Sequence, residues 1–373
     1  MRIGIDARMV YYRQAGIAQY VSRLIEALAQ INRQDEFILL QSRKDLLNIT
    51  DQPNFSRRSL WTPSHHRFEQ WTIPFEVWPL GLDVLHSPDF IPPMRSSLRS
   101  LITVHDLAFL RFPHFLTEES ARYYGQIDGA VARADHIVAV SESTKRDIIE
   151  LLGVPAGKIT VIYEAANPIY RPIQDPHDLI PIREKYELPE DYVLFVSTIE
   201  PRKNLPTLLR AFRLLAEEYV NNDVVLAVVG EKGWLFEETF RLVGELNLGK
   251  RVCFLGRVPL HDLPYLYNGA AVHVHPSFYE GFGLTPLEAM ACATPTIASN
   301  VSSLPEVVGD AGLIVEPTDV EGLAMAIWNV ISQPELREEL RAKGLKRAAL
   351  FSWQKAAQYH LDLYRRLGHG AKS

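Results

Sequence analysis

The chain has 373 residues, which is enough for two domains that each bury a hydrophobic core. Its 47% hydrophobic and 23% charged residues are typical of a globular protein, and a formal net charge of −6 argues against nucleic acid as the main partner. Cys253 and Cys292 are too few for a disulfide framework and lack metal-type spacing, so we expect a protein of the reducing cytoplasm. The strand-like start at 1–6 does not have the pattern of a signal peptide, so we expect none. No apolar run reaches about 18 residues, so we expect no membrane span, although peripheral contact stays open.

Strands and helices alternate in the first half of the chain. Residues 2–6 predict a buried strand, and a loop then leads to a helix at about 17–29 with Val21, Leu24 and Leu28 on one face. Further strands are expected at 36–40, 83–86, 101–104, 136–140 and 159–162, with helices at 66–78, 118–133 and 142–152. This alternation is typical of a parallel doubly wound sheet, in which ligands bind beyond the carboxyl ends of the strands.

Several residues of this half are candidates for ligand contacts. Gly16 ends the first loop, but a turn or helix-cap glycine is the simpler interpretation because no Gly-x-Gly-x-x-Gly motif is present. His86 and His105 stand at strand ends, where a histidine is more often structural than catalytic. The segment 141–144 most simply starts a helix with a hydroxyl cap.

An aromatic segment runs from Trp61 to Trp78. Trp71, Phe75 and Trp78 recur at helical spacing, and such a stripe usually packs in a core. The alternative is a surface that faces an acceptor or a membrane.

Prolines and polar residues between Glu164 and Asp191 interrupt the alternation and predict an interdomain linker. A second series then predicts strands near 192–197, 224–229, 251–255, 271–274, 295–299 and 312–315. We therefore expect two doubly wound domains in tandem that enclose a substrate between them.

The turn after the first strand of this second series carries Arg202 and Lys203. It precedes a helix with an apolar face of Leu205, Leu208, Leu209, Phe212, Leu215 and Tyr219. Two cations at a helix N-terminus oppose the helix dipole, so they indicate a bound anion, with a solvated charge pair as the alternative.

Residues 273–317 read as a strand, a glycine-containing loop and a helix. Gly281 and Gly283 let the backbone approach a ligand, and the free amides at the helix start favour a phosphate group. Glu280 and Glu288 repel a phosphate unless they accept hydrogen bonds from hydroxyls of the same ligand, as sugars offer. For Glu288 a capping box with Thr285 is an equally simple interpretation.

Part of the second half of the chain resembles the acid-x7-acid signature of family 4 glycosyltransferases of the GT-B fold. The matching residues are 276–284, 288–290, Pro295 and 304–307. The resemblance extends over nearly the whole chain, and one departure is Ala293, where the family usually has glycine. It implies an α/β GT-B fold with two doubly wound Rossmann-like domains facing a central cleft. The implied divisions are an acceptor-binding domain at 1–170, a linker at 171–190, a nucleotide-sugar donor-binding domain at 191–350, and a helix at 351–373 that crosses back to the first domain.

The resemblance also implies roles for single residues. Glu280 and His105 are the catalytic candidates, and both would contact the donor sugar, His105 from the first domain. Glu288 would bind the ribose. Lys203 would bind the diphosphate, with Arg202 replacing an arginine that many members carry where this chain has Thr198. The other expected donor-binding residues are Gly16, Val258, Gly281, Phe282, Gly283, Leu284 and Thr285.

The implied activity is retaining transfer of a hexose from a nucleotide-diphosphate sugar to a hydroxyl of a growing glycan, polysaccharide or lipid-linked sugar. Mannose from GDP-mannose is favoured because the His-Asp-Leu and Glu-Pro-Arg-Lys-Asn segments are similar to those of bacterial polysaccharide mannosyltransferases, and UDP-sugars stay open. No Asp-x-Asp occurs, so we expect no metal and no cofactor. The alternatives are a phosphorylase or epimerase and a non-catalytic nucleotide-sugar-binding protein. We expect a cytoplasmic location, with peripheral contact at the inner face of the membrane as an option.

Overall fold

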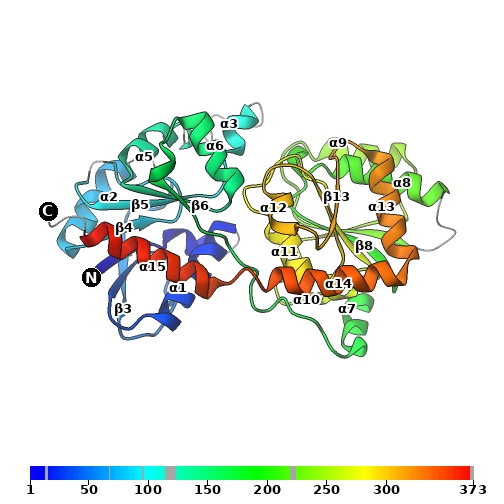
Figure 1. Cartoon of the computed structure of the whole chain (residues 1–373), viewed down its shortest axis with the longest axis horizontal. Helices are drawn as coiled ribbons and strands as arrows, with labels where there is room; N and C mark the ends of the chain where they lie inside the picture. The colour runs from blue at the N-terminus through cyan, green and yellow to red at the C-terminus, as the bar shows by residue number, and fades with distance from the viewer. Residues whose placement is uncertain (13–15, 67, 95, 114–122, 219–223, 370–373) are drawn as a thin grey trace. The chain divides into compact units, whose positions relative to one another are not determined.

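The protein is represented by a computed structural model that describes residues 1–12, 16–66, 68–94, 96–113, 123–218 and 224–369. The chain divides into two compact units. The first comprises Met1–Glu164 with Ser352–Ser373, and the second comprises Ala165–Phe351. In Figure 1 the colour follows the chain from the blue N-terminus to the red C-terminal helix of the first unit.

A seven-stranded parallel sheet forms the centre of the first unit, in the order β3-β2-β1-β4-β5-β6-β7. Its strands are β1 (Arg2–Asp6), β2 (Glu36–Ser42), β3 (Phe55–Leu60), β4 (Val84–Ser87), β5 (Arg99–Val104), β6 (His136–Ala139) and β7 (Ile159–Val161). The chain runs from β1 out to one edge and returns to β4 on the other side of β1. This order confirms the prediction of a parallel doubly wound sheet.

β3 is the strand that the sequence pattern missed. It reads Phe-Ser-Arg-Arg-Ser-Leu and buries only Phe55 and Leu60 fully. Because β3 lies at the sheet edge and pairs only with β2, it lacks the apolar run of a central parallel strand.

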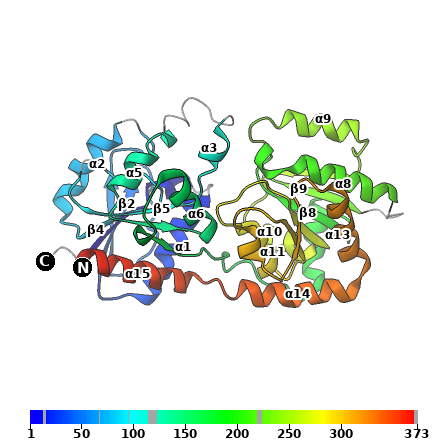
Figure 2. The same cartoon turned by 45° about the horizontal axis from the view of Figure 1, so that its top comes forward.

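The described α-helices of this unit are α1 (Gly16–Ile31), α2 (Glu69–Val77), α3 (Ala108–Arg111), α5 (Ile127–Arg133), α6 (Glu142–Leu152) and α15 (Trp353–His369). α1 buries Val21, Leu24 and Leu28 as predicted. The first part of the helix expected at 118–133 lies outside the described residues. α15 packs beside α1 (Figure 2). Between these helices the Tyr20 hydroxyl lies 2.9 Å from Nε2 of His360.

The aromatic stripe does not pack in the core. Trp71, Phe75 and Trp78 are 53%, 78% and 82% exposed, so the expectation of a core position is wrong. α2 instead buries Ile73 and Val77 against the sheet. Both sets of residues have helical spacing, so periodicity alone could not decide which face meets the core.

The second unit contains a six-stranded parallel sheet in the order β10-β9-β8-β11-β12-β13. Its strands are β8 (Tyr192–Val196), β9 (Val225–Val229), β10 (Val252–Gly256), β11 (Val272–His275), β12 (Thr296–Ser299) and β13 (Leu313–Val315), each within a predicted segment or one residue beyond it. The described α-helices are α7 (Ile180–Lys185), α8 (Leu205–Glu218), α9 (Glu237–Glu245), α10 (Leu263–Gly269), α11 (Leu284–Ala291), α12 (Leu304–Val308), α13 (Val320–Ser332) and α14 (Pro334–Ala348).

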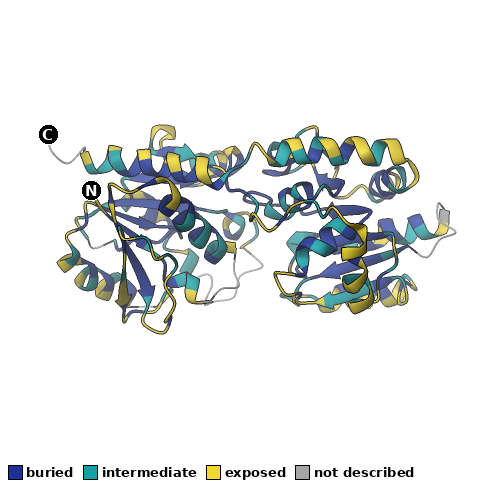
Figure 3. Ribbon diagram, turned by 90° about the horizontal axis from the view of Figure 1, so that it is seen from below, coloured by how far each residue is buried: buried dark blue, intermediate teal, exposed yellow. Residues whose placement is uncertain are grey.

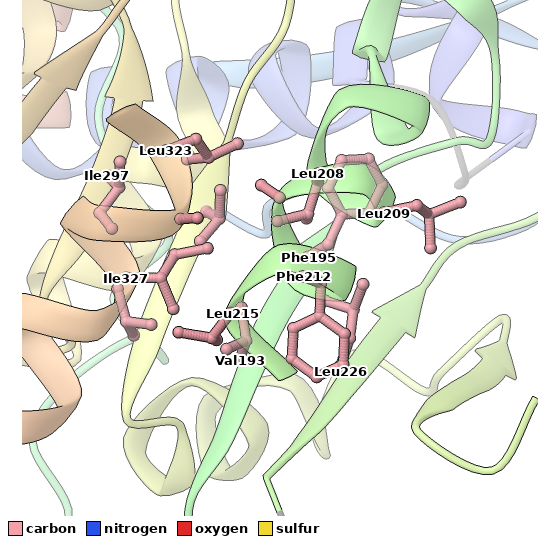
Figure 4. Packing of buried hydrophobic residues seen from close by; sticks show 14 of the residues in the cluster. Val193, Phe195, Leu208, Leu209, Phe212, Leu215, Leu226, Ile297, Leu323 and Ile327 are labelled. Atoms are coloured by element: carbon pink, nitrogen blue, oxygen red, sulfur yellow. The ribbon is translucent and has the colours of Figure 1, made fainter. Parts of the chain in front are cut away.

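The core of this unit explains why α8 and α13 lie on the sheet. Figure 4 shows Phe212 and Leu215 of α8 packed with Phe195 of β8 and Ile327 of α13, and all four are buried. Tyr219, expected on the same face of α8, lies outside the described residues. Figure 3 shows the same division of burial in each unit, with buried strands and exposed outer helix surfaces.

The segment 171–190 lies within the second unit and carries α7. Pro181 stands in the first turn of α7, where a missing backbone N–H costs no helical hydrogen bond. Among the described residues, no helix is long and apolar enough to cross a membrane.

Candidate functional site

The loop between β11 and α11 holds a buried carboxylate, Glu280, with 9% of its surface exposed. Lys203 Nζ donates to both of its oxygens, at 2.7 and 2.9 Å. Nη1 of Arg202 lies 3.6 Å from Glu280 Oε2, and the same guanidinium pairs with Glu200. The turn that carries Arg202 and Lys203 and the loop that carries Glu280, here called the acid loop, therefore form one ion cluster. The sequence had pointed to these two segments separately.

Glu280 is held as an anion. Burial would raise its pKa, but the charge of Lys203 and the hydrogen bond from His275 outweigh burial, so the pKa lies well below the usual value. The expected anion partner of Lys203 is thus a protein carboxylate in this structure. A buried carboxylate accepts hydrogen bonds and donates none, which suits it to sugar hydroxyls, while the two cations suit phosphate oxygens.

Neutral side chains complete the surroundings of Glu280. Nε2 of His275 lies 2.7 Å from Glu280 Oε1, and the Ser277 hydroxyl donates to the same oxygen at 2.8 Å. Burial lowers the pKa of His275 despite the neighbouring Glu280, so the ring is neutral. Its proton then lies on Nε2, and Nδ1 accepts a hydrogen bond from the Thr285 hydroxyl at 3.1 Å.

The backbone of this loop needs glycine at one position. Gly283 has φ of 110°, and a Cβ there would approach Leu304 to 3.0 Å. The Ser303 hydroxyl donates to the carbonyl oxygens of Glu280 and Phe282 at 3.0 and 2.6 Å, which fixes the loop against α12. Ala293, where the family usually has glycine, also has positive φ, at 59°.

The capping-box interpretation of Glu288 is wrong. α11 begins at Leu284, Gly283 occupies the cap position, and no side chain caps this helix. Thr285 bonds His275 instead, and Glu288 Oε2 accepts a hydrogen bond from the Tyr267 hydroxyl at 3.0 Å. Burial raises the pKa of Glu288 to about 8, although hydrogen bonds from Tyr267 and Tyr170 oppose the rise.

We expect Glu288→Gln to reduce the loss of stability as pH rises towards 8. Because the folded-state pKa of Glu288 lies above that of an unfolded chain, its contribution to stability is present at low pH and is lost as pH rises through about 8. Between pH 6 and pH 9 the melting temperature of the wild type should fall further than that of the variant, by roughly 2–4 °C for each kcal/mol involved. Thermal unfolding at several pH values tests this, and parallel curves for the two proteins would contradict it.

His105 lies in the first unit, at the end of β5. Its Nδ1 is 3.0 Å from Glu164 Oε1, and its Nε2 is 2.9 Å from the carbonyl oxygen of Pro88. His86 instead bonds Tyr364 and Thr103 inside the core.

The remaining candidates fall into two groups. Gly281, Phe282 and Gly283 are buried in the acid loop, whereas Leu284 and Thr285 at the start of α11 are half-buried. Gly16 is exposed as the first residue of α1, and Val258 is buried in the loop after β10. Neither has a polar side chain that could reveal a ligand.

Sequence reasoning missed several polar residues that contact the candidates. They are Glu164, Glu200, Tyr170, Tyr267, His275, Ser277, Ser302 and Ser303. His275 could have been found, because it ends a buried strand at the carboxyl edge of the sheet and lies five residues before Glu280. Among the described residues, no group of three or more His, Cys, Asp or Glu side chains is arranged to hold a metal ion.

Two family models match the chain. Residues 180–347 match "Glycosyl transferases group 1", and residues 15–168 match "Glycosyltransferase Family 4". O-antigen chain mannosyltransferase B of Escherichia coli is 32% identical, with 98% of this chain and 100% of that protein covered. O-antigen chain mannosyltransferase RfbU of Salmonella typhimurium is 31% identical, with 86% of this chain and 88% of that protein covered. A solved structure of sucrose-phosphate synthase from Thermosynechococcus elongatus superimposes with a TM-score of 0.79 at 25% identity, with 99% of this chain and 100% of that chain covered.

Proposed function

Because the chain belongs to glycosyltransferase family 4 and has the GT-B fold, we propose that it transfers mannose from GDP-mannose to a hydroxyl of a growing polysaccharide, with retention. The observation that carries this proposal is the ionised Glu280 joined to Lys203 beside Gly283 and the start of α11. Two relatives named O-antigen chain mannosyltransferases support the choice of sugar. UDP-sugars are the alternative donors.

In the proposed mechanism the second unit binds the donor nucleotide. Lys203 and Arg202 hold the diphosphate, whose negative charge grows as the sugar leaves, so these cations stabilise the transition state more than the ground state. The amides of Gly281, Phe282, Gly283 and Leu284 and the Thr285 hydroxyl add donors on the same side, while Gly16 and Val258 allow close approach of phosphate and base.

Two glutamate side chains bind the hydroxyl groups of the donor. The Glu280 carboxylate accepts from the sugar and stabilises positive charge at the anomeric carbon, and the carboxyl group of Glu288 accepts from the ribose. The acceptor hydroxyl, held by the first unit, attacks from the side on which the diphosphate departs. The departing phosphate then takes the hydroxyl proton, so retention needs no covalent intermediate on the protein.

A ligand screen tests the choice of donor. A ligand that binds only the folded protein raises its melting temperature by mass action. We expect GDP and GDP-mannose to raise it more than UDP, ADP and their sugar conjugates, equally with and without EDTA. No response to any diphosphate would overturn the proposal, and a response limited to UDP would replace the donor.

We also propose that the enzyme works at the cytoplasmic face of a membrane and touches the bilayer with an aromatic surface of the first unit, formed by Trp61, Trp71, Phe75 and Trp78. These side chains are 53% or more exposed, and Trp71, Phe75 and Trp78 share one face of α2 and its continuation. Three of them, with Leu98, line a hollow of about 540 Å³. Large exposed aromatic patches mark interaction sites, and tryptophan favours the membrane–water interface.

The charge beside the aromatic surface favours an anionic bilayer as its partner. The Arg43 guanidinium lies 4.2 Å from the centre of the Trp61 ring, and Lys44 and Arg58, which are close to these residues in sequence, are exposed. Leu46 and Leu47 in the same loop are 83% and 57% exposed, which adds apolar side chains next to the cations. Basic and apolar residues together are the usual composition of an interfacial binding surface.

Replacing Trp71, Phe75 and Trp78 together by serine should lower binding to vesicles of phosphatidylglycerol and phosphatidylethanolamine by tenfold or more, because about 0.8 kcal/mol is lost for each buried CH₂ equivalent. Vesicle flotation measures the bound fraction. Tyr359→Ser is the matched control, since Tyr359 is 58% exposed on α15 of the same unit. The proposal that the aromatic surface binds membranes would be contradicted if the triple variant and the control floated equally. It would also be contradicted if the wild type stayed in the unbound fraction.

A further inference from the structure

The pair formed by His105 and Glu164 has a defined proton arrangement. The Pro88 carbonyl can only accept a hydrogen bond, so the His105 Nε2 that lies 2.9 Å away must carry a proton. On the other side of the ring, Nδ1 faces the Glu164 carboxyl at 3.0 Å. Either Nδ1 also carries a proton and the ring is an imidazolium beside a carboxylate, or Glu164 itself is protonated.

The neighbouring groups favour the charged pair, although burial opposes it. The Glu164 side chain is only 4% exposed, and His105 is its hydrogen-bond partner in the described part of the chain. Burial would lower the pKa of His105, but Glu164, the Pro88 carbonyl and Asp89 together raise it above the ordinary value.

The elements around the ring supply no described cation that competes for Glu164. α1 contributes Tyr20, whose ring meets the His105 ring edge-on at 4.7 Å between centres. The segment after β4 contributes Asp89, already bonded by His65 and Tyr123, and α15 contributes His360 behind Tyr20. The pKa values of His86 and His360 are lowered by burial, so these two rings are neutral.

We propose that Glu164 is a positioning residue that keeps His105 as an imidazolium, so that His105 supplies a fixed positive charge and cannot act as a base. For its catalytic consequence this inference rests on the proposed function and on the role that the family resemblance implies for His105, a contact with the donor sugar. A protonated ring cannot take the proton of the acceptor hydroxyl. That proton must therefore go to another group, which agrees with the departing phosphate proposed above.

Histidine-selective ¹³C NMR of the full chain tests the proposal without any turnover. We expect His105, assigned by its absence in His105→Gln, to be mostly protonated at pH 7 in the wild type and to titrate at higher pH than an ordinary histidine. In Glu164→Gln the ring should titrate below pH 7, since an ordinary histidine has a pKa of about 6.5 and burial lowers it further. A neutral wild-type ring at pH 7, or an unchanged titration in Glu164→Gln, would overturn the proposal.

The pH profile of transfer adds a second measurement. If the charge on His105 is needed, kcat/KM of Glu164→Gln should fall about tenfold per pH unit at pH values above the titration midpoint of His105 in that variant. Glu164→Asp keeps the carboxylate and should keep the wild-type pH profile. So should the control Asp128→Asn, because Asp128 is exposed. A confirmed NMR titration with a flat profile would leave the ion pair in place and remove His105 from the proposed donor site. Should Glu164→Gln fail to fold, the wild-type titration alone decides whether His105 is charged.

Discussion

Replacing Glu280 by glutamine should lower the rate of sugar transfer by about 10²–10³-fold, the cost of removing one preorganised electrostatic group from a transition state. The amide keeps the shape of the carboxyl group and can still accept from Ser277. It loses the negative charge that would stabilise the developing cation at the anomeric carbon. Initial rates at saturating donor measure the effect, and turnover close to that of the wild type would exclude Glu280 from catalysis.

The same substitution should also destabilise the fold, because Lys203 would remain largely buried without its partner. The Lys203 side chain is 12% exposed, and breaking a buried pair on one side costs about 3–5 kcal/mol. Activity must therefore be compared at a temperature where the variant is folded. Glu321→Gln is a suitable control, since Glu321 is exposed in the first turn of α13 of the same unit and should change neither rate nor stability.

Lys203→Ala should weaken binding of the donor diphosphate by about 1.5–3 kcal/mol, the value of a hydrogen bond to a charged group. That range corresponds to roughly a 10- to 150-fold rise in the dissociation constant of GDP. Isothermal titration calorimetry measures it, with Lys250→Ala as the control at an exposed lysine. An unchanged dissociation constant would place Lys203 outside the donor site and leave it a structural partner of Glu280.

A double variant separates the structural role of this ion pair from its functional role. With Lys203→Met and Glu280→Gln together, neither charge is left unpaired, so most of the stability lost in each single variant should return. The transfer rate and the affinity for the diphosphate should stay as low in the double variant as in the single variants. Recovery of activity together with stability would mean that the pair only holds the loop in place.

The two sheets could be predicted because central parallel strands are buried on both faces and appear as short apolar runs. β3 could not, since an edge strand with Arg57 and Arg58 has no such run. The aromatic face of α2 was assigned to the wrong side because helical spacing does not indicate which face meets the core.

At the candidate site, residue types were easier to predict than their partners. Glu280 and Lys203 were both identified, but their direct contact joins positions 77 residues apart, which no local pattern encodes. Glu164 was assigned to the start of a linker, although it bonds a histidine 59 residues earlier. The start of α11 was misplaced because Thr285 and Pro286 imitate a capped helix start, whereas the positive φ of Gly283 determines the actual one.

The most direct test of retaining mannosyl transfer is the anomeric configuration of the product. GDP-mannose labelled with ¹³C at the anomeric carbon, offered with mannose-terminated oligosaccharides, gives a product whose one-bond carbon–proton coupling reports that configuration by NMR. Since the donor is α-linked, we expect an α-linked mannoside from the wild type and, at an equal reaction time, about 10²–10³-fold less of it from Glu280→Gln. A β-linked product, or wild-type protein that binds GDP-mannose and transfers its sugar to no acceptor, would contradict the account.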